Sequence, residues 1–120
     1  MPDFGGEGSA PRAAAGLLVS ALVRSVAAEG GNGMVLAKGD ATSGAILIVI
    51  LERGALRGLH ERIPGAGGYT LAPTGPADPA APGALTDYLA RRRRSDPDLW
   101  VVELDGDGDM PLRVAAELLG

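Results

Sequence analysis

Apolar residues in this chain are grouped into stretches separated by glycine- and proline-rich segments. Between Arg12 and Glu29 they recur at helical spacing, with Pro11 before them and Gly30-Gly31 after them, which predicts a helix over this range. One stripe of a helix is too narrow to hold all of its apolar side chains, which are Leu17, Leu18, Val19, Leu22, Val23 and Val26. We therefore expect burial on two sides, one against a sheet and one as a candidate contact between subunits.

The middle of the chain predicts a sheet. Ala45–Leu51 (AILIVIL) is a continuous apolar run rich in β-branched residues, which is typical of a central strand covered on both faces. Met34–Lys38 precedes it as a short strand, and Leu56–Ile63 follows it as a more exposed one. From residue 64 to 83, five prolines and five glycines leave room only for a brief strand at Tyr69–Leu71.

The last third predicts two further elements and a short closing helix. Ala84–Arg94 has apolar residues at the i, i+3, i+4 spacing of a helix, and Pro97 prevents it from continuing. Leu99–Leu104 reads as a strand, and Pro111–Leu119 as a short helix. Residues 1–10 predict a disordered tail.

These elements predict a single α+β domain over residues 11–120. We expect a layered sandwich in which a mixed or antiparallel sheet of about four or five strands is packed by two main helices.

Composition narrows the functional classes. The formal net charge of −4 argues against general affinity for nucleic acid or anionic lipid. The absence of cysteine excludes disulfides, thiol nucleophiles and cysteine metal sites. The apolar segment Ala13–Ala28 is short for a membrane span and carries Arg24, and the chain start lacks the positive charges of a signal peptide. We expect a cytoplasmic protein with no membrane contact.

Three motifs carry a family resemblance: Pro11–Arg24 (PRAAAGLLVSALVR), Lys38–Ile50 (KGDATSGAILIVI) and Asp87–Asp105 (DYLARRRRSDPDLWVVELD). Together they resemble the alphaproteobacterial family called domain of unknown function 1491, over nearly the whole chain after the N-terminal tail. The resemblance implies a small layered α-and-β domain from an alphaproteobacterium, and it implies no activity. Two departures are Leu18, where the family tends to carry tryptophan, and a looser segment at Gly67–Thr70.

Two loops look like ligand sites but lack the residues that the chemistry needs. Gly39–Gly44 has the glycine spacing of a phosphate-binding loop, but no Lys-Ser/Thr pair or helix follows it. It reads as a turn in which Asp40 caps local amides and the glycines adopt unusual dihedral angles. Asp105–Asp109 begins like a calcium loop, but its sixth position is Met110 and its twelfth is Ala116. Neither loop predicts a cofactor or a metal.

Arg91–Arg94 is the strongest charged feature. Four successive helical residues fan out around the axis, so they cannot form one patch. Arg92 falls at the edge of the buried face and the other three point outward, where nearby carboxylates can neutralise them. The alternative is an anion site for phosphate, nucleic acid or an acidic partner, because arginine binds oxygens bidentately.

Strand alternation places Glu103 with Leu99 and Val101, opposite Trp100. A half-buried carboxylate needs a partner, and we expect Glu103 to pair with Arg91 or Arg92. The single histidine, His60, has polar neighbours and predicts a surface position on a strand. No residue is assigned a catalytic role. The candidate anion or partner surface comprises Arg91, Arg92, Arg93, Arg94, Asp96, Asp98, Trp100, Glu103 and Asp40.

Three functional hypotheses follow. The first is a non-enzymatic interaction module with a possible protein partner, which forms a homodimer through the first helix or an exposed sheet edge. The second is anion or nucleic-acid binding through Arg91–Arg94, for which nucleic acid is disfavoured by the net charge. The third is an enzyme whose carboxylates, among them Asp40, Asp96, Asp98 and Glu103, are brought together by folding.

Overall fold

The computed structural model describes residues 14–120 and confirms the predicted α+β fold. The predicted tail over residues 1–10 and the first part of the predicted helix lie outside the described residues. The elements in chain order are α1 (Ala15–Ala28), β1 (Asn32–Ala37), β2 (Ile46–Glu52), β3 (Ala55–Gly65), β4 (Gly68–Thr74), α2 (Ala84–Ser95), β5 (Trp100–Asp105) and α3 (Met110–Leu119).

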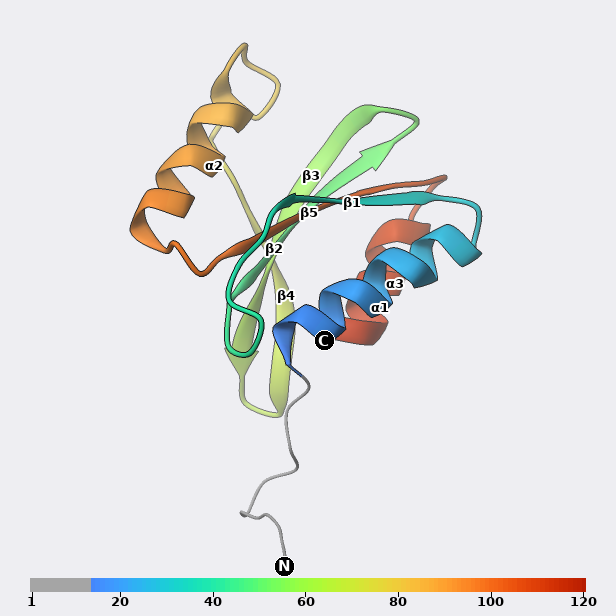
Figure 1. Ribbon diagram of the computed structural model, residues 1–120. Coiled ribbons are helices and arrows are strands. Elements are labelled where there is room, and N and C mark those ends of the chain that lie inside the picture. Colours follow the sequence, from blue (N-terminus) through green and yellow to red (C-terminus); the bar gives the residue numbers. More distant parts are fainter. Residues whose placement is uncertain (1–13) are drawn as a thin grey trace, which may run out of the picture.

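The five strands form one mixed sheet in the order β1-β5-β2-β3-β4 (Figure 1). Only the β2–β5 pair is parallel, and the other three pairs are antiparallel. The last strand therefore inserts between the first two, and β1 and β4 become the edges. The segment that contains α2 provides the crossover that a parallel pair requires.

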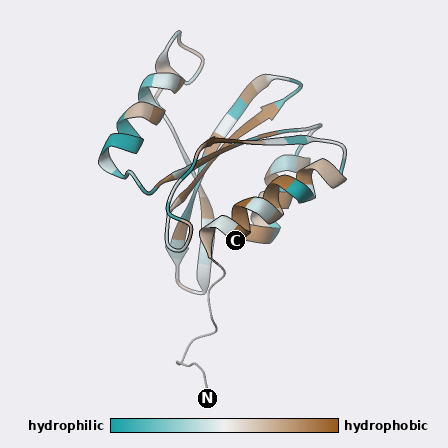
Figure 2. Ribbon diagram, viewed as in Figure 1, coloured by the Kyte–Doolittle hydropathy of each residue, from teal (hydrophilic) through white to brown (hydrophobic). Residues whose placement is uncertain are grey.

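The sheet separates two layers of apolar side chains. On one face, the core of α1 and α3 packs on Ile46, Ile48, Ile50, Val102 and Leu104. On the other face, Leu85, Tyr88 and Leu89 of α2 pack on Leu47, Val49, Leu59, Leu99 and Val101. Figure 2 shows apolar colour on α1 and α3, whereas the C-terminal end of α2 is hydrophilic. The helical spacing of the α2 residues thus identified its buried face correctly.

The apolar run in β2 is buried on both faces, as predicted. Each residue of Ile46–Ile50 is at most 5% exposed. The strand lies between β5 and β3, so both rows of its side chains meet a core. A continuous apolar run is the pattern expected of such a position.

The second apolar side of α1 is covered within the chain. Val19, Leu22 and Val26 are buried, and α1 contacts α3 as well as β1 and β5. Leu18 and Val23 pack against the same core, which leaves Leu17 as the one exposed large apolar residue of α1. The wide apolar surface of α1 is therefore explained by α3, which the sequence suggested only as a short closing helix.

β4 is longer than predicted. It spans Gly68–Thr74 and pairs with β3 from Leu59 to Gly65, where only Tyr69–Leu71 was expected. Pro73 is accommodated because β4 is an edge strand, where a missing N–H need not break a ladder. Pro73, which argued against a strand in the sequence, is thus compatible with a strand at the edge of the sheet.

Within residues 14–120, no helix is both long and apolar enough to span a bilayer.

Candidate functional site

Arg92 joins α2 to β3 through a partly buried ion pair. Its two Nη atoms donate to the two carboxylate oxygens of Glu61, each at 2.8 Å. Nη1 also donates to the hydroxyl of Tyr88 at 3.1 Å, and that hydroxyl lies 2.6 Å from Oγ1 of Thr74. The pKa of Arg92 is raised, chiefly by the hydrogen bonds to Glu61. This arginine is a structural link between the helix and two strands.

Arg93 is also engaged within the fold. Its Nη1 donates to the backbone carbonyls of Pro97 at 2.8 Å, Leu99 at 2.6 Å and Lys38 at 3.2 Å. The guanidinium thus closes the turn after α2 and ties it to the end of β1. The expectation that Arg93 points outward is wrong, because its guanidinium turns back to donate to carbonyls of the segment before β5 and of the residue after β1.

Arg91 and Arg94 are exposed. Arg91 lies 5.8 Å from the ring centroid of Tyr88. No carboxylate among the described residues forms an ion pair with either side chain. The four arginines therefore divide into two structural links and two outward cations, and they do not form one patch.

Glu103 does not pair with Arg91 or Arg92. Arg92 pairs with Glu61, because β3 presents that carboxylate to α2 whereas Glu103 lies two strands away on β5. Glu103 lies opposite Met34 of β1 and is partly buried. Its carboxylate forms no hydrogen bond or ion pair with the other residues of the described chain.

Asp40 organises the turn between β1 and β2. Its carboxylate accepts hydrogen bonds from the amides of Ser43 and Thr42 at 2.8 and 3.1 Å, which confirms the predicted cap. These bonds, first that of Ser43, lower the pKa of Asp40. The Asp40 carbonyl accepts a hydrogen bond from Nε1 of Trp100 at 2.7 Å. The turn is thus fixed on the buried indole.

The glycines of this turn have a steric role. A Cβ at Gly39 or Gly44 would overlap the carbonyl of Asp98 and the ring of Trp100. Neither glycine has a positive φ, so the expectation of unusual dihedral angles is wrong here. Their spacing reflects the close approach of the turn to the start of β5, not a phosphate cradle.

The structure brings together only part of the candidate surface. Asp40, Trp100, Asp98, Asp96 and Arg93 meet where the turn crosses the segment before β5, with the Asp40 amide donating to the Asp98 carbonyl at 3.0 Å. Arg91, Arg92, Arg94 and Glu103 lie apart from this crossing.

The candidate carboxylates do not converge on a cleft. Asp40, Asp96, Asp98 and Glu103 line none of three hollows on the surface of residues 14–120. The same residues contain no group of three or more His, Cys, Asp or Glu side chains placed to hold a metal ion. The described residues therefore give the carboxylate-enzyme hypothesis no geometric support.

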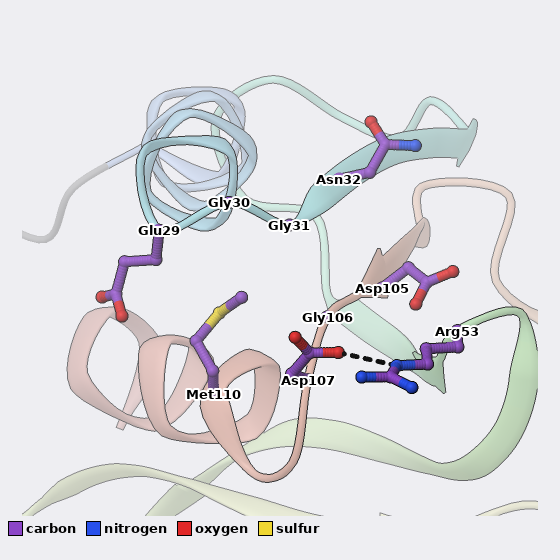
Figure 3. Close-up of a pocket in the computed structure, with 9 residues that line it drawn as sticks. All are labelled: Glu29, Gly30, Gly31, Asn32, Arg53, Asp105, Gly106, Asp107 and Met110. Carbon is purple, nitrogen blue, oxygen red and sulfur yellow. Dashed lines mark hydrogen bonds and ion pairs between the residues drawn. The ribbon is translucent and has the colours of Figure 1, made fainter.

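The acidic turn Asp105–Asp109 is tied to the β2–β3 hairpin. The Asp105 carboxylate accepts from the Gly54 amide at 3.0 Å, and Asp107 pairs with Nε of Arg53 at 3.1 Å. Figure 3 shows Arg53 and Asp107 facing each other. Both line a shallow hollow of about 300 Å³. These carboxylates serve as acceptors for protein donors.

A second hollow, of about 430 Å³, lies between the start of α1, the turn before β2 and the β3–β4 hairpin. Thr42, Ser43, Arg62 and Tyr69 are its polar lining residues. The guanidinium carbon of Arg62 lies 3.6 Å from the ring centroid of Tyr69, and its Nε donates to the Leu119 carbonyl at 3.0 Å. Arg62 thus ties β3 and β4 to the end of α3.

His60 is more buried than the sequence suggested. It lies on β3 opposite Ile48 of the core, and its Nδ1 is buried without a hydrogen-bond partner among the described residues. Burial lowers its pKa. The residues next to His60 in the sequence face the opposite side of the strand, so their polarity did not predict the burial of the imidazole.

β1 is an edge strand with an uncovered apolar row. Three of the five exposed large apolar side chains in the described chain are consecutive on it: Met34 is 52% exposed, Val35 41% and Leu36 43%. The strand pairs only with β5 and contains a bulge between Val35 and Ala37. A hollow of about 300 Å³ lies beside it, lined by Val35, Trp100 and residues of α1. β1 therefore carries more exposed large apolar side chains than any other element of the described chain.

The sequence profile of the family described as "Protein of unknown function (DUF1491)" matches residues 13–112. The chain belongs to the DUF1491 family.

Solved structures agree with this assignment. A crystal structure of a DUF1491 protein from Caulobacter crescentus CB15 is 30% identical, with a TM-score of 0.66 over 77% of this chain and 86% of that one. An NMR structure of a DUF1491 protein from the same organism is 32% identical, with a TM-score of 0.65 over 78% and 86%. A protein from A. tumefaciens solved in solution is 29% identical, with a TM-score of 0.64 over 82% and 89%. No curated protein matches the chain.

Membership in DUF1491 confirms the resemblance predicted from the three motifs. The family description assigns no function, so the activity of this DUF1491 domain has to be inferred from its own surface. Sequence reasoning missed Met34, Val35 and Leu36 as candidate residues. Their signal was an apolar run without proline or charge, but its exposure depends on a strand order that the sequence did not reveal.

Proposed function

We propose that this DUF1491 domain is a non-enzymatic interaction module that binds by adding a partner strand to the free edge of β1. Extended segments bind exposed sheet edges through backbone hydrogen bonds, and side-chain pockets provide specificity. The single observation that supports this most strongly is the row of exposed apolar residues Met34, Val35 and Leu36 on an edge strand.

The composition of β1 supports strand addition. Sheet edges that must stay unpaired usually carry proline, charged residues or a covering element. Asn32–Ala37 contains neither proline nor charge, although a bulge interrupts its pairing near Leu36. An apolar edge of this kind is favourable for pairing because it contributes both hydrogen-bonding groups and apolar area.

The hollow beside β1 offers a place for a partner side chain. Val35 and Trp100 line it on the sheet, and Val19 and Val23 line it on α1. Its lining is mainly apolar, with Arg24 and Ser20 at the helix side. A strand paired with β1 would place alternate side chains on this face, where an apolar one would be buried.

The absence of cysteine suits a reducing compartment, where structural disulfides are rare. The proposal is accordingly for a cytoplasmic interaction module.

Photo-crosslinking in an alphaproteobacterial cell tests the surface. Benzoylphenylalanine is placed at Met34 (Met34→benzoylphenylalanine) and, as a matched control, at Ile63, an exposed apolar residue of β3 outside β1. We expect irradiation to give discrete adducts from position 34 and none from position 63. No adduct from position 34, or the same adducts from both positions, would contradict the proposal.

Anion binding is the second candidate, and the exposed side chains of Arg91 and Arg94 keep it testable. It predicts low-salt binding of single-stranded RNA that weakens steeply as salt rises. The double variant Arg91→Ala/Arg94→Ala should abolish that binding and leave the fold intact. A chain that binds no RNA at low salt removes this candidate.

A further inference from the structure

We infer that the strand added at β1 is β1 of a second copy, paired antiparallel about a two-fold axis at Val35. The inference rests on the proposed function, since it names the partner of the same edge. A two-fold axis makes the same surface meet itself, so every residue contact occurs twice. Two five-stranded sheets would then continue as one across the dimer.

The apolar row is self-complementary in this arrangement. An axis at Val35 places Val35 opposite Val35 of the second copy, and Met34 of each copy opposite Leu36 of the other. All three exposed side chains of β1 gain an apolar neighbour across the pair. A register centred elsewhere leaves part of the row in water.

The charges at the two ends of β1 favour the antiparallel direction. Lys38 follows the C-terminal end of the strand, and no carboxylate of residues 14–120 forms an ion pair with it. At the N-terminal end, Asn32 lies opposite Asp105 of β5. Antiparallel pairing brings the basic end of each copy to the acidic end of the other. Parallel pairing would set Lys38 against Lys38, which is repulsive.

Glu103 lies one strand behind the second copy in this arrangement, on the strand β5 that pairs with β1. Its carboxylate is half-buried beside Met34 and forms no hydrogen bond or ion pair with the other described residues. Leaving a carboxylate half-buried without a partner is unfavourable. In the two-fold arrangement Lys38 of the second copy lies opposite Asn32, and therefore across β1 from Asp105. Glu103 lies two residues along β5, across Met34 from Leu36 of the second copy, so the lysine approaches the Asp105 end of β5 and the register gives Glu103 no direct partner.

The size of the contact indicates a weak dimer. One short strand pair interrupted by the bulge near Leu36 provides few backbone hydrogen bonds. Interfaces below about 1,200 Å² of total buried area are typical of transient complexes. We therefore expect reversible association over the micromolar range and not an obligate dimer.

Sedimentation equilibrium of the full chain tests the axis by charge complementation. Val35→Lys and Val35→Glu each place two like charges face to face across the axis, so each variant alone should be monomeric. An equimolar mixture should recover the dimer, because lysine then faces glutamate. Ile63→Lys, a matched control on β3, should dimerise like the unmodified chain.

A mild-oxidation experiment keeps the test decisive if a charged variant fails to fold. The chain has no cysteine, so Val35→Cys introduces a single thiol that faces its own copy across the axis. We expect a disulfide-linked dimer from Val35→Cys and none from Ile63→Cys at the same concentration.

A chain that stays monomeric across the micromolar range would overturn the inference, as would a dimer unaffected by both charged variants or a mixture that does not recover. These outcomes are distinct from failure of the proposed function. If Met34 crosslinks only to another protein, strand addition at β1 stands and the second copy is wrong as its partner. If Met34 crosslinks to nothing, strand addition itself is wrong.

Discussion

The two edges of this sheet are built differently. At β4, Thr74 contacts the Tyr88 hydroxyl of α2, and Arg62 of the neighbouring strand stacks on Tyr69 and bonds to the end of α3. β4 also contains Pro73, which lies opposite His60 of β3. At β1 the exposed positions are Met34, Val35 and Leu36, and the contact from α2 is the bond from Arg93 to the Lys38 carbonyl beyond the strand.

The comparison distinguishes β4, which is tied to the helices by polar contacts, from β1, where large apolar side chains remain exposed. Proline disfavours further pairing at β4, and polar links tie this side of the sheet to both helical layers. β1 has an apolar row in place of such links. Since both edges belong to one sheet of one chain, the contrast marks β1 as the surface that is suited to binding.

The largest expected effect is a loss of stability when the ion pair between Arg92 of α2 and Glu61 of β3 is removed. Arg92→Ala leaves Glu61 half-buried without its bidentate partner, with the side chain of Glu61 only 21% exposed. We expect a loss of about 2 kcal/mol in the free energy of unfolding, between the values typical of surface and buried pairs. Urea denaturation measures it.

Arg91→Ala is the matched control, because it removes a neighbouring arginine whose side chain is exposed. It should change the free energy of unfolding by less than about 0.5 kcal/mol. Equal losses from the two variants would mean that the Arg92–Glu61 pair does not secure this side of the sheet.

A smaller loss is expected from Tyr88→Phe. The variant keeps the ring by which α2 packs on the sheet, but it removes the hydroxyl that contacts both Thr74 and Arg92. We expect a decrease of about 1 kcal/mol in the free energy of unfolding, the usual net value for such bonds. Thermal and urea unfolding provide the measurement, and an unchanged stability would show that β4 is held by packing alone.

The smallest effect is a pH dependence at His60. Burial lowers the pKa of the imidazole below its ordinary value of 6.5, so the unfolded chain takes up the proton first as pH falls. Stability is therefore complete above pH 6.5 and declines as pH falls below it. Because this is the single histidine, His60→Leu should remove the slope of the unfolding free energy between about pH 6.5 and 5. A slope that persists in the variant would assign the effect to other groups.

The elements that local pattern determines were predicted well. The apolar run Ala45–Leu51 gave a strand within one residue of β2, and the spacing of Leu85, Tyr88 and Leu89 gave the buried face of α2. The glycine pair after Glu29 placed the end of α1 within one residue. These signals work because burial on one or two faces imposes its own period on the sequence.

The site depended on partners distant in sequence. Arg92 meets Glu61 and Trp100 meets Asp40 only because β5 inserts beside β2, which no local pattern specifies. The same insertion makes β1 an edge. The sequence therefore predicted β1 as a strand but could not predict that its apolar residues would remain exposed.

Amide hydrogen exchange at the two edges tests the central claim most directly. Exchange is followed at Asn32–Ala37 and at Gly68–Thr74 in dilute and in concentrated solutions of the full chain. Pairing at β1 predicts that raising the concentration slows exchange at the first segment and leaves the second unchanged. Exchange that is independent of concentration at both edges, or that slows equally at both, would contradict the assignment of β1 as the open edge.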